Sequence, residues 1–187
     1  MSEGKFNRVI GLVGLPCSGK GTVVDILKGK GFWATSLSDR IREELASRKE
    51  EATRERLQMV GGEMRNKYGV NVLAEMTWRK ILEDKVKKVV VDAIRSEAEV
   101  NYFRKKGNFI LLAVTASSRI RFERMKARQR ESDPKTWEEF LVNEERDKKM
   151  HGRNIDVCMA MADRVIENSG SLDELREKVD FVISTGV

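Results

Sequence analysis

Gly14-Leu15-Pro16-Cys17-Ser18-Gly19-Lys20-Gly21-Thr22 is the stretch that decides the fold. It follows the apolar run Val9–Val13 and opens a segment with the composition of a helix. A strand, a glycine-rich turn, a lysine and a helix in this order form a phosphate-binding loop, or P-loop. The glycines let backbone N–H groups turn inward around phosphate oxygens, and the helix N-terminus adds partial positive charge. We therefore expect ATP to bind along this whole stretch, with Lys20 as the catalytic cation on its β- and γ-phosphates.

Two positions of the loop depart from the usual pattern. Gly21 stands where a serine or threonine commonly supplies a hydroxyl ligand to Mg²⁺, and Thr22 follows it. Cys17 stands where a further glycine is common, and we interpret it as a small side chain. We expect Asp92, at the end of an apolar strand, to hold Mg²⁺ directly or through water, and the missing hydroxyl favours water.

Working outward from the loop, strands alternate with helices along the whole chain. The expected strands are residues 7–13, 32–37, 88–93, 109–115 and 164–167. Strands alternating with helices predict a parallel sheet that is covered on both faces. We therefore expect an α/β protein with a three-layer α/β/α P-loop NTPase fold and a five-stranded parallel sheet. Residues 1–187 are expected to form a single P-loop domain, with a helical insertion at 38–86 and an arginine-rich segment at 118–150.

Three local signals place helix boundaries. Ser38 is expected to cap a helix that runs to about Arg48. Gly61-Gly62 is expected to be a weak point or hinge in a helix over 57–68. Asp133-Pro134 is expected to begin a helix, because proline is favoured in the first turn.

Composition limits the classes of function. The chain has 187 residues, 36 basic and 30 acidic, with a net charge of +6. Its apolar runs are far shorter than the about 18 residues that cross a bilayer, and Cys17 and Cys158 do not make a disulfide framework. We expect a cytoplasmic protein with no membrane partner. The basic charge fits a nucleic-acid surface, a solvated coat or arginines that bind phosphates; the motifs favour arginines and make a nucleic-acid partner the weaker interpretation.

Three residues are candidates for the acceptor side of the site. Asp39 and Arg42 are three positions apart, so they share a helix face and form either an intrahelical ion pair or part of the acceptor site. Arg95 follows the third strand and has a guanidinium suited to two-pronged contacts with a phosphate. The alternative for Arg95 is a salt bridge to Glu97 or Glu99.

A cluster of arginines follows the fourth strand. Like charges on one helix repel unless an anion approaches, which a closing lid would satisfy by bringing them onto ATP. The alternative is a solvated helix whose arginines pair with neighbouring glutamates. Arg128 and Arg130 are the preferred catalytic candidates because the helix gives way to a loop there, and Arg128 is also expected to contact ATP. The cluster consists of Arg121, Arg124, Arg128 and Arg130.

The loop resembles the Gly-x-Pro-Gly-x-Gly-Lys-Gly-Thr loop of adenylate kinases. Leu37–Arg42 resembles their segment with the acceptor-binding arginine, and Val90–Arg95 resembles their strand-end Asp-Gly-Phe-Pro-Arg, one residue shorter. Arg121–Arg130 is similar to their lid, whereas Ala162–Leu175 is closer to dephospho-CoA kinases. As a whole, the chain most resembles the adenylate-kinase-related, dephospho-CoA-kinase-like proteins common in archaea.

The resemblance implies roles for particular residues. Arg42 and Arg95 would bind the phosphate of the acceptor, and Asp39 would point into the acceptor site. Asn168 and Gly170 would form the loop beside adenine. The single histidine, His151, is assigned no role.

Three functions follow from these patterns. The first is ATP-dependent phosphotransfer to a small phosphorylated acceptor, a nucleoside or deoxynucleoside monophosphate. The second is a dephospho-CoA kinase, in which the acceptor is a neutral ribose hydroxyl and Asp39 accepts its proton. The third is a P-loop ATPase switch that binds RNA or a ribosomal partner, although a switch needs no second phosphate site. The oligomeric state and the base preference stay open.

Overall fold

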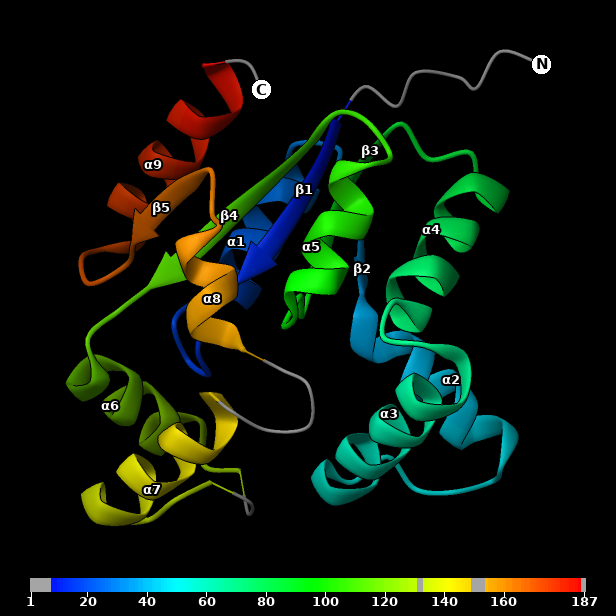
Figure 1. Ribbon diagram of the computed structural model, residues 1–187. Helices are drawn as coiled ribbons and strands as arrows, with labels where there is room; N and C mark the ends of the chain where they lie inside the picture. Colours follow the sequence, from blue (N-terminus) through cyan, green and yellow to red (C-terminus); the bar gives the residue numbers. More distant parts are fainter. Residues whose placement is uncertain (1–7, 131–132, 149–153, 186–187) are drawn as a thin grey trace.

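Parallel strands form the centre of the structure, a computed structural model that describes residues 8–130, 133–148 and 154–185. Five strands pair in the order β2-β3-β1-β4-β5 within these ranges (Figure 1). Every neighbouring pair is parallel, so all strands end at the same edge of the sheet. The expected five-stranded parallel sheet is therefore confirmed. The strands are β1 (Arg8–Val13), β2 (Trp33–Ser36), β3 (Lys88–Asp92), β4 (Phe109–Thr115) and β5 (Arg164–Glu167).

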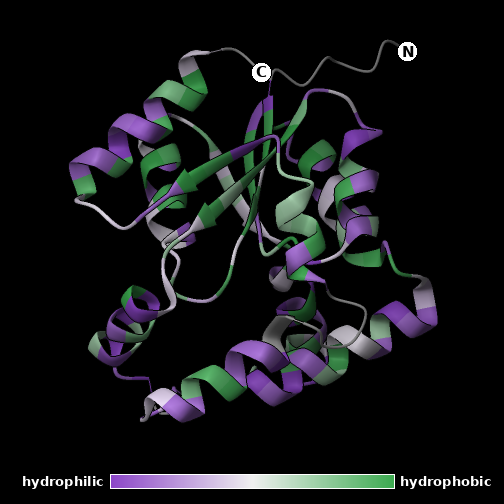
Figure 2. Cartoon of the chain, turned by 60° about the vertical axis from the view of Figure 1, so that its left-hand side comes forward, coloured by the Kyte–Doolittle hydropathy of each residue, from purple (hydrophilic) through white to green (hydrophobic). Residues whose placement is uncertain are grey.

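Apolar side chains on both faces of the sheet explain its layers. In β1, Ile10 and Leu12 join a core with α1 (Lys20–Gly29) and α9 (Leu172–Ser184). Val9 and Val13 of the same strand belong to a second core, formed with α5 (Glu97–Arg104) and α8 (Ile155–Ala160). Figure 2 shows the strands as largely hydrophobic, whereas the helices alternate between hydrophobic and hydrophilic residues. This is the expected three-layer α/β/α fold.

Two helical segments extend beyond the sheet. Between β2 and β3 lie α2 (Leu37–Ser47), α3 (Arg54–Tyr68) and α4 (Val72–Glu83), which are the helices expected in the insertion at 38–86. After β4 come α6 (Ser118–Arg128) and α7 (Trp137–Lys148), in the segment expected as the lid. Figure 1 shows these two segments on either side of the lower end of the molecule. Residues 131–132 and 149–150 of the expected lid, and His151, lie outside the described ranges.

No helix in the described ranges is both long and apolar enough to cross a membrane.

The start of α2 differs from the prediction. The cap is Ser36, not Ser38: the Ser36 hydroxyl accepts a hydrogen bond from the Ser38 amide at 3.2 Å. The Asp39 carboxylate accepts one from the Ser36 amide at 2.8 Å. This reciprocal arrangement is a capping box, so a serine three positions before an acid was the stronger signal.

The start of α7 was also predicted wrongly. The helix begins at Trp137, after Asp133-Pro134, because Thr136 and Glu139 form the reciprocal cap. The Glu139 carboxylate also accepts a hydrogen bond from the Lys135 amide at 2.8 Å. The short helix α8 was not predicted, since it is too short to show a helical period and its signal is limited to the Asn154 cap.

Gly61-Gly62 does not interrupt α3, so the expected hinge is wrong. Gly61 is buried where α3 crosses α2, and a Cβ on it would lie 2.8 Å from Cδ1 of Ile41. Gly62 has nothing within 4 Å of the same position. The glycine at position 61 therefore permits close packing of the two helices rather than bending.

The two glycines predict opposite effects of alanine. Gly62→Ala should raise the free energy of unfolding by up to about 1 kcal/mol, because alanine is the better helix former. Gly61→Ala adds a methyl group against Ile41, so it should be less stable than Gly62→Ala by about 1–3 kcal/mol. Urea denaturation of the two variants measures the difference. Equal stability of the two would show that the α2–α3 contact does not require glycine.

Candidate functional site

The phosphate loop joins β1 to α1 at the carboxyl edge of the sheet. Gly14 and Gly19 have φ values of 151° and 105°. A Cβ on Gly14 would overlap the carbonyl oxygen of Val114, and one on Gly19 would overlap the side-chain amide of Asn168. Both positions thus need glycine for conformation and for space, because the loop packs directly on β4 and on the segment after β5.

Cys17 occupies the left-handed region, with φ of 60°. This explains why glycine is common at this position, since a side chain there costs about 1–2 kcal/mol. Cys17 packs against a small core of the α6–α7 segment formed by Phe122, Met125 and Phe140. Burial raises the pKa of its thiol, which therefore stays protonated at neutral pH. The loop keeps its turn with cysteine in place, consistent with the interpretation as a small side chain.

The Lys20 side chain folds back over the loop, and burial disfavours its charged form. Its Nζ donates hydrogen bonds to the carbonyl oxygens of Gly14 at 2.7 Å and Leu15 at 3.0 Å. Burial lowers its pKa to about 8; the charge of Asp92 opposes this effect and the charge of Arg95 adds to it. Gly19, the N-cap of α1, supplies no side-chain cap, so the first amides of the helix remain available to an anion. An oxyanion bound here would meet both the ammonium and these amides.

Asp92 stands at the end of β3, beside the loop. Its Oδ1 is buried and has no hydrogen-bond partner among the described residues. A buried carboxylate oxygen without a partner is costly, and a hard cation would satisfy it. Mg²⁺ bound with phosphates and water needs only one or two protein carboxylates. The part of the chain that the structure describes has no group of three or more His, Cys, Asp and Glu side chains that could hold a metal alone.

One arginine of the cluster reaches the loop, and it is Arg124, which was not among the preferred candidates. Its guanidinium donates to the carbonyl oxygen of Asn168 at 2.9 Å and lies 3.4 Å from that of Ser18. Arg121 is 3% exposed and pairs with Glu144, so it joins α6 to α7. Helical spacing predicted that these arginines come from one helix, but it could not predict which of them would face the loop.

Arg128 and Arg130, the preferred catalytic candidates, lie at the end of α6 and just after it. Arg128 forms a two-pronged ion pair with Asp133, with Nε at 2.6 Å from Oδ2. Arg130 is exposed, and its carbonyl oxygen accepts a hydrogen bond from the Asp133 amide at 2.9 Å. Both charges still act on the Cys17 thiol, where they oppose the effect of burial on its pKa. Their expected contacts with ATP remain predictions.

Asn168 ties three parts of the site together. Its side-chain amide donates to the Ser18 carbonyl at 2.8 Å, and its backbone amide donates to Thr115 at 2.8 Å. Its own carbonyl oxygen accepts the bond from Arg124. The structure thus places Asn168 against the backbone of the phosphate loop. Gly170 lies beside the Glu174 carboxylate at the start of α9, and the expected role of both residues near adenine stays a prediction.

The expected acceptor residues occupy two places. Asp39 and Arg42 pair at 3.1 Å on the exposed side of α2, and the other Asp39 oxygen caps the helix. Arg95 follows β3, with its amide held by Glu99 at 2.9 Å, and its charge acts on Lys20. The Glu99 carboxylate also pairs with Arg65 at 2.9 Å.

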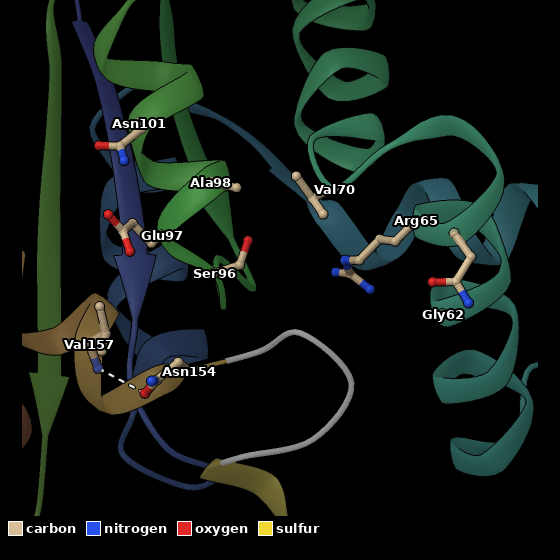
Figure 3. A pocket seen from close by; sticks show the side chains of 10 residues that line it. Gly62, Arg65, Val70, Ser96, Glu97, Ala98, Asn101, Asn154 and Val157 are labelled. Carbon is tan, nitrogen blue, oxygen red and sulfur yellow. Dashed lines mark hydrogen bonds between the residues drawn. The ribbon is translucent and has the colours of Figure 1, made fainter.

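A cavity of about 660 Å³ opens between α3, the start of α5 and α8. Figure 3 shows Arg65 reaching from α3 toward the start of α5, where Ser96 and Glu97 lie. Arg65 is 9% exposed, and its Nε has no partner in the described part of the chain. Sequence reasoning missed Arg65, because a charged residue within a polar helix carries no sign that it is buried. The lining residues are Gly62, Arg65, Asn66, Val70, Ser96, Glu97, Ala98, Asn101, Asn154 and Val157.

Comparisons with known sequences give a matching family model and several relatives. The family model described as an AAA domain matches residues 10–151. A UPF0200 protein of Pyrococcus horikoshii is 39% identical over 181 residues, covering 94% of this chain and 96% of the relative. A UPF0200 protein of Hyperthermus butylicus is 36% identical, covering 97% of this chain and 96% of the relative.

Solved structures show a similar fold. Shikimate kinase from Acinetobacter baumannii, in complex with shikimate, superposes with a TM-score of 0.61 at 17% identity, covering 97% of this chain and 95% of that chain. A putative kinase from Chloroflexus aurantiacus gives a TM-score of 0.55 at 14% identity, covering 98% and 100%. At these identities the likeness concerns the fold, a P-loop kinase architecture.

The lowered pKa of Lys20 predicts a pH-dependent affinity for ATP. In the free protein the ammonium loses its proton near pH 8, whereas bound phosphates favour the charged form and raise its pKa. Affinity should therefore be constant below about pH 7 and fall above pH 8, by up to about tenfold per pH unit. Calorimetric titration from pH 7 to 9.5 should show proton uptake in the wild-type protein and none in Lys20→Arg, which stays charged. A pH-independent wild-type affinity would contradict the assignment.

Proposed function

The chain belongs to the UPF0200 family, and an AAA domain model matches its residues 10–151. From this premise we propose that it is an ATP-dependent phosphotransferase acting on a small phosphorylated acceptor, a nucleoside or deoxynucleoside monophosphate. The observation that carries the proposal is the convergence of Lys20, Asp92 and Arg95. Lys20 belongs to the phosphate loop, and Ser96, the residue after Arg95, lines the cavity at the start of α5. A donor and an acceptor phosphate could therefore meet between them.

The residues would act by position and charge. The loop amides and Lys20 would bind the β- and γ-phosphates, and Arg95 would hold the acceptor phosphate or the transferring group. Asp92 would hold Mg²⁺, which when bound neutralises charge between the phosphates. Arg124, already against the loop carbonyls, is placed to add positive charge beside it. The single kinase domain, with an acceptor-binding insertion at 38–86 and a lid at 118–150, is part of this proposal.

The environment of Asp39 favours a phosphate acceptor over a hydroxyl acceptor. A kinase acting on the ribose hydroxyl of dephospho-CoA needs a carboxylate that can accept a proton. Asp39 has one oxygen on the Ser36 amide and the other on Arg42, so it is committed to capping α2 and to an ion pair. A phosphate acceptor is already anionic and needs no base. The switch alternative would leave the cavity beside Arg95 without a role.

The proposal is tested by ADP release with a panel of acceptors. Ribo- and deoxynucleoside monophosphates and dephospho-CoA are compared with no acceptor, with and without Mg²⁺. We expect at least one monophosphate to stimulate ATP turnover. No stimulation by any of them would refute the proposal, and turnover that rises only with RNA or a protein partner would favour the switch.

Asp39→Asn separates the two kinase functions. As a cap residue, Asp39 should cost about 1 kcal/mol of stability when replaced, with kcat reduced no more than a few-fold below the melting transition. As the general base of a dephospho-CoA kinase it should cost about 100-fold or more in kcat. Thermal melting and initial rates on the same preparation measure both. Near-complete inactivity in a folded variant would reverse the order of the two functions.

A further inference from the structure

The cavity between α3, α5 and α8 lies outside the residues considered so far for the acceptor phosphate. We propose that it binds the organic part of the acceptor and selects a ring that bears an amino group, with Glu97 accepting the hydrogen bond of that group. This inference rests on the proposed function and adds the class of acceptor to it. The features that carry it are the volume of the cavity, its amides and the exposed carboxylate of Glu97 on its wall.

The position and the volume of the cavity suit a ring-shaped part of an acceptor. The cavity begins at Ser96, directly after Arg95, so a molecule with its phosphate at Arg95 would extend its other end into the cavity. Its volume of about 660 Å³ lies within the range of small-molecule sites. Val70, Ala98 and Val157 supply apolar surface for the faces of a ring.

Amide groups line the same cavity. Asn66, Asn101 and Asn154 each carry both a donor and an acceptor, which suits the mixed edge of a heterocycle. The Asn154 side-chain oxygen already accepts a hydrogen bond from the Val157 amide at 3.1 Å, as the cap of α8. Its NH₂ group therefore remains as a donor for a ring nitrogen or carbonyl.

Arg65 and Glu97 are the charged residues among those that line the cavity. Arg65 and Glu99 pair at 2.9 Å and are both buried, so their charges cancel. Glu97 stays exposed on the cavity wall in the first turn of α5. Burial, together with the charges of Glu99 and Glu97, raises the pKa of Cys158 in α8 to about 12, consistent with a negative potential on this side. Figure 3 shows Glu97 and Asn101 on α5, on the same side of the cavity as Val157 of α8.

A carboxylate distinguishes an amino group from an oxo group. It accepts a hydrogen bond from a ring amine, but it faces the oxygen of an oxo ring with like partial charge and leaves both groups unpaired. Sites that hydrogen-bond one group and cannot pair the other discriminate strongly. Because Glu97 is partly solvated, we expect a preference of about 10- to 100-fold.

The test compares acceptor pairs that differ between amino and oxo groups, AMP with IMP and CMP with UMP. In the wild-type protein kcat/KM should favour the amino member of at least one pair by about tenfold or more. Glu97→Gln can turn its NH₂ toward an oxo group, so the ratio should approach one because the efficiency with the oxo acceptor rises. A gain of activity of this kind cannot come from structural damage.

Glu83→Gln on α4 is the matched control, since it removes an exposed carboxylate away from the cavity and should keep the wild-type ratio. A wild-type ratio near one, or a ratio that Glu97→Gln leaves unchanged, would overturn the inference. The proposed function fails if no monophosphate of the acceptor panel is phosphorylated, and calorimetric binding of these four nucleotides decides the inference separately. Selective binding lost in Glu97→Gln would then support it, and binding without selectivity or no binding would overturn it.

Discussion

A parallel sheet with both faces buried leaves only its edges for polar chemistry, and this constraint positions the whole candidate site. The strands are apolar on both faces, so charged groups collect where the strands end. The phosphate loop follows β1, Asp92 ends β3 and Asn168 follows β5, all at one edge. Asn168 connects the segment after β5 to the loop and to β4, because it donates hydrogen bonds to the carbonyl oxygens of Ser18 and Thr115. Residues far apart in the chain meet because of the direction of the strands.

Charges at this edge are held in a partly unsatisfied state. Lys20 has its pKa lowered to about 8 by burial, and Asp92 keeps a buried oxygen without a partner in the described ranges. Other charged groups nearby are satisfied: Arg121 pairs with Glu144 and Arg128 with Asp133. The contrast separates groups that hold the α6–α7 segment together from groups that a charged ligand would stabilise. Preorganised charge of this kind favours an anion and its cation over water.

Patterns within short stretches were predicted well, and long-range contacts were not. The phosphate loop and the parallel sheet follow from local spacing, so the sequence was sufficient for them. The choice of Arg124 over Arg128 depends on how α6 is rotated against the loop, which tertiary packing decides. The burial of Arg65 depends on Glu99, far along the chain, and no local pattern links the two. Ser36 was passed over because Ser38 is also a good cap residue, and only the reciprocal bond with Asp39 separates them.

The buried pair of Arg65 and Glu99 connects α3 to the start of α5, beside the carboxyl edge of the sheet. One Glu99 oxygen holds Arg65 of α3, and the other accepts the amides of Arg95 and Ser96 at 2.9 and 3.2 Å. A buried ion pair contributes little net stability compared with an apolar pair of the same size. It does restrict how its two side chains lie relative to each other, because a displaced partner leaves a buried charge unpaired. A shift of α3 would break the bond to Glu99, whose other oxygen orients the backbone that carries Arg95. The position of Arg65 on the cavity wall and that of the backbone at Arg95 are therefore set by one carboxylate.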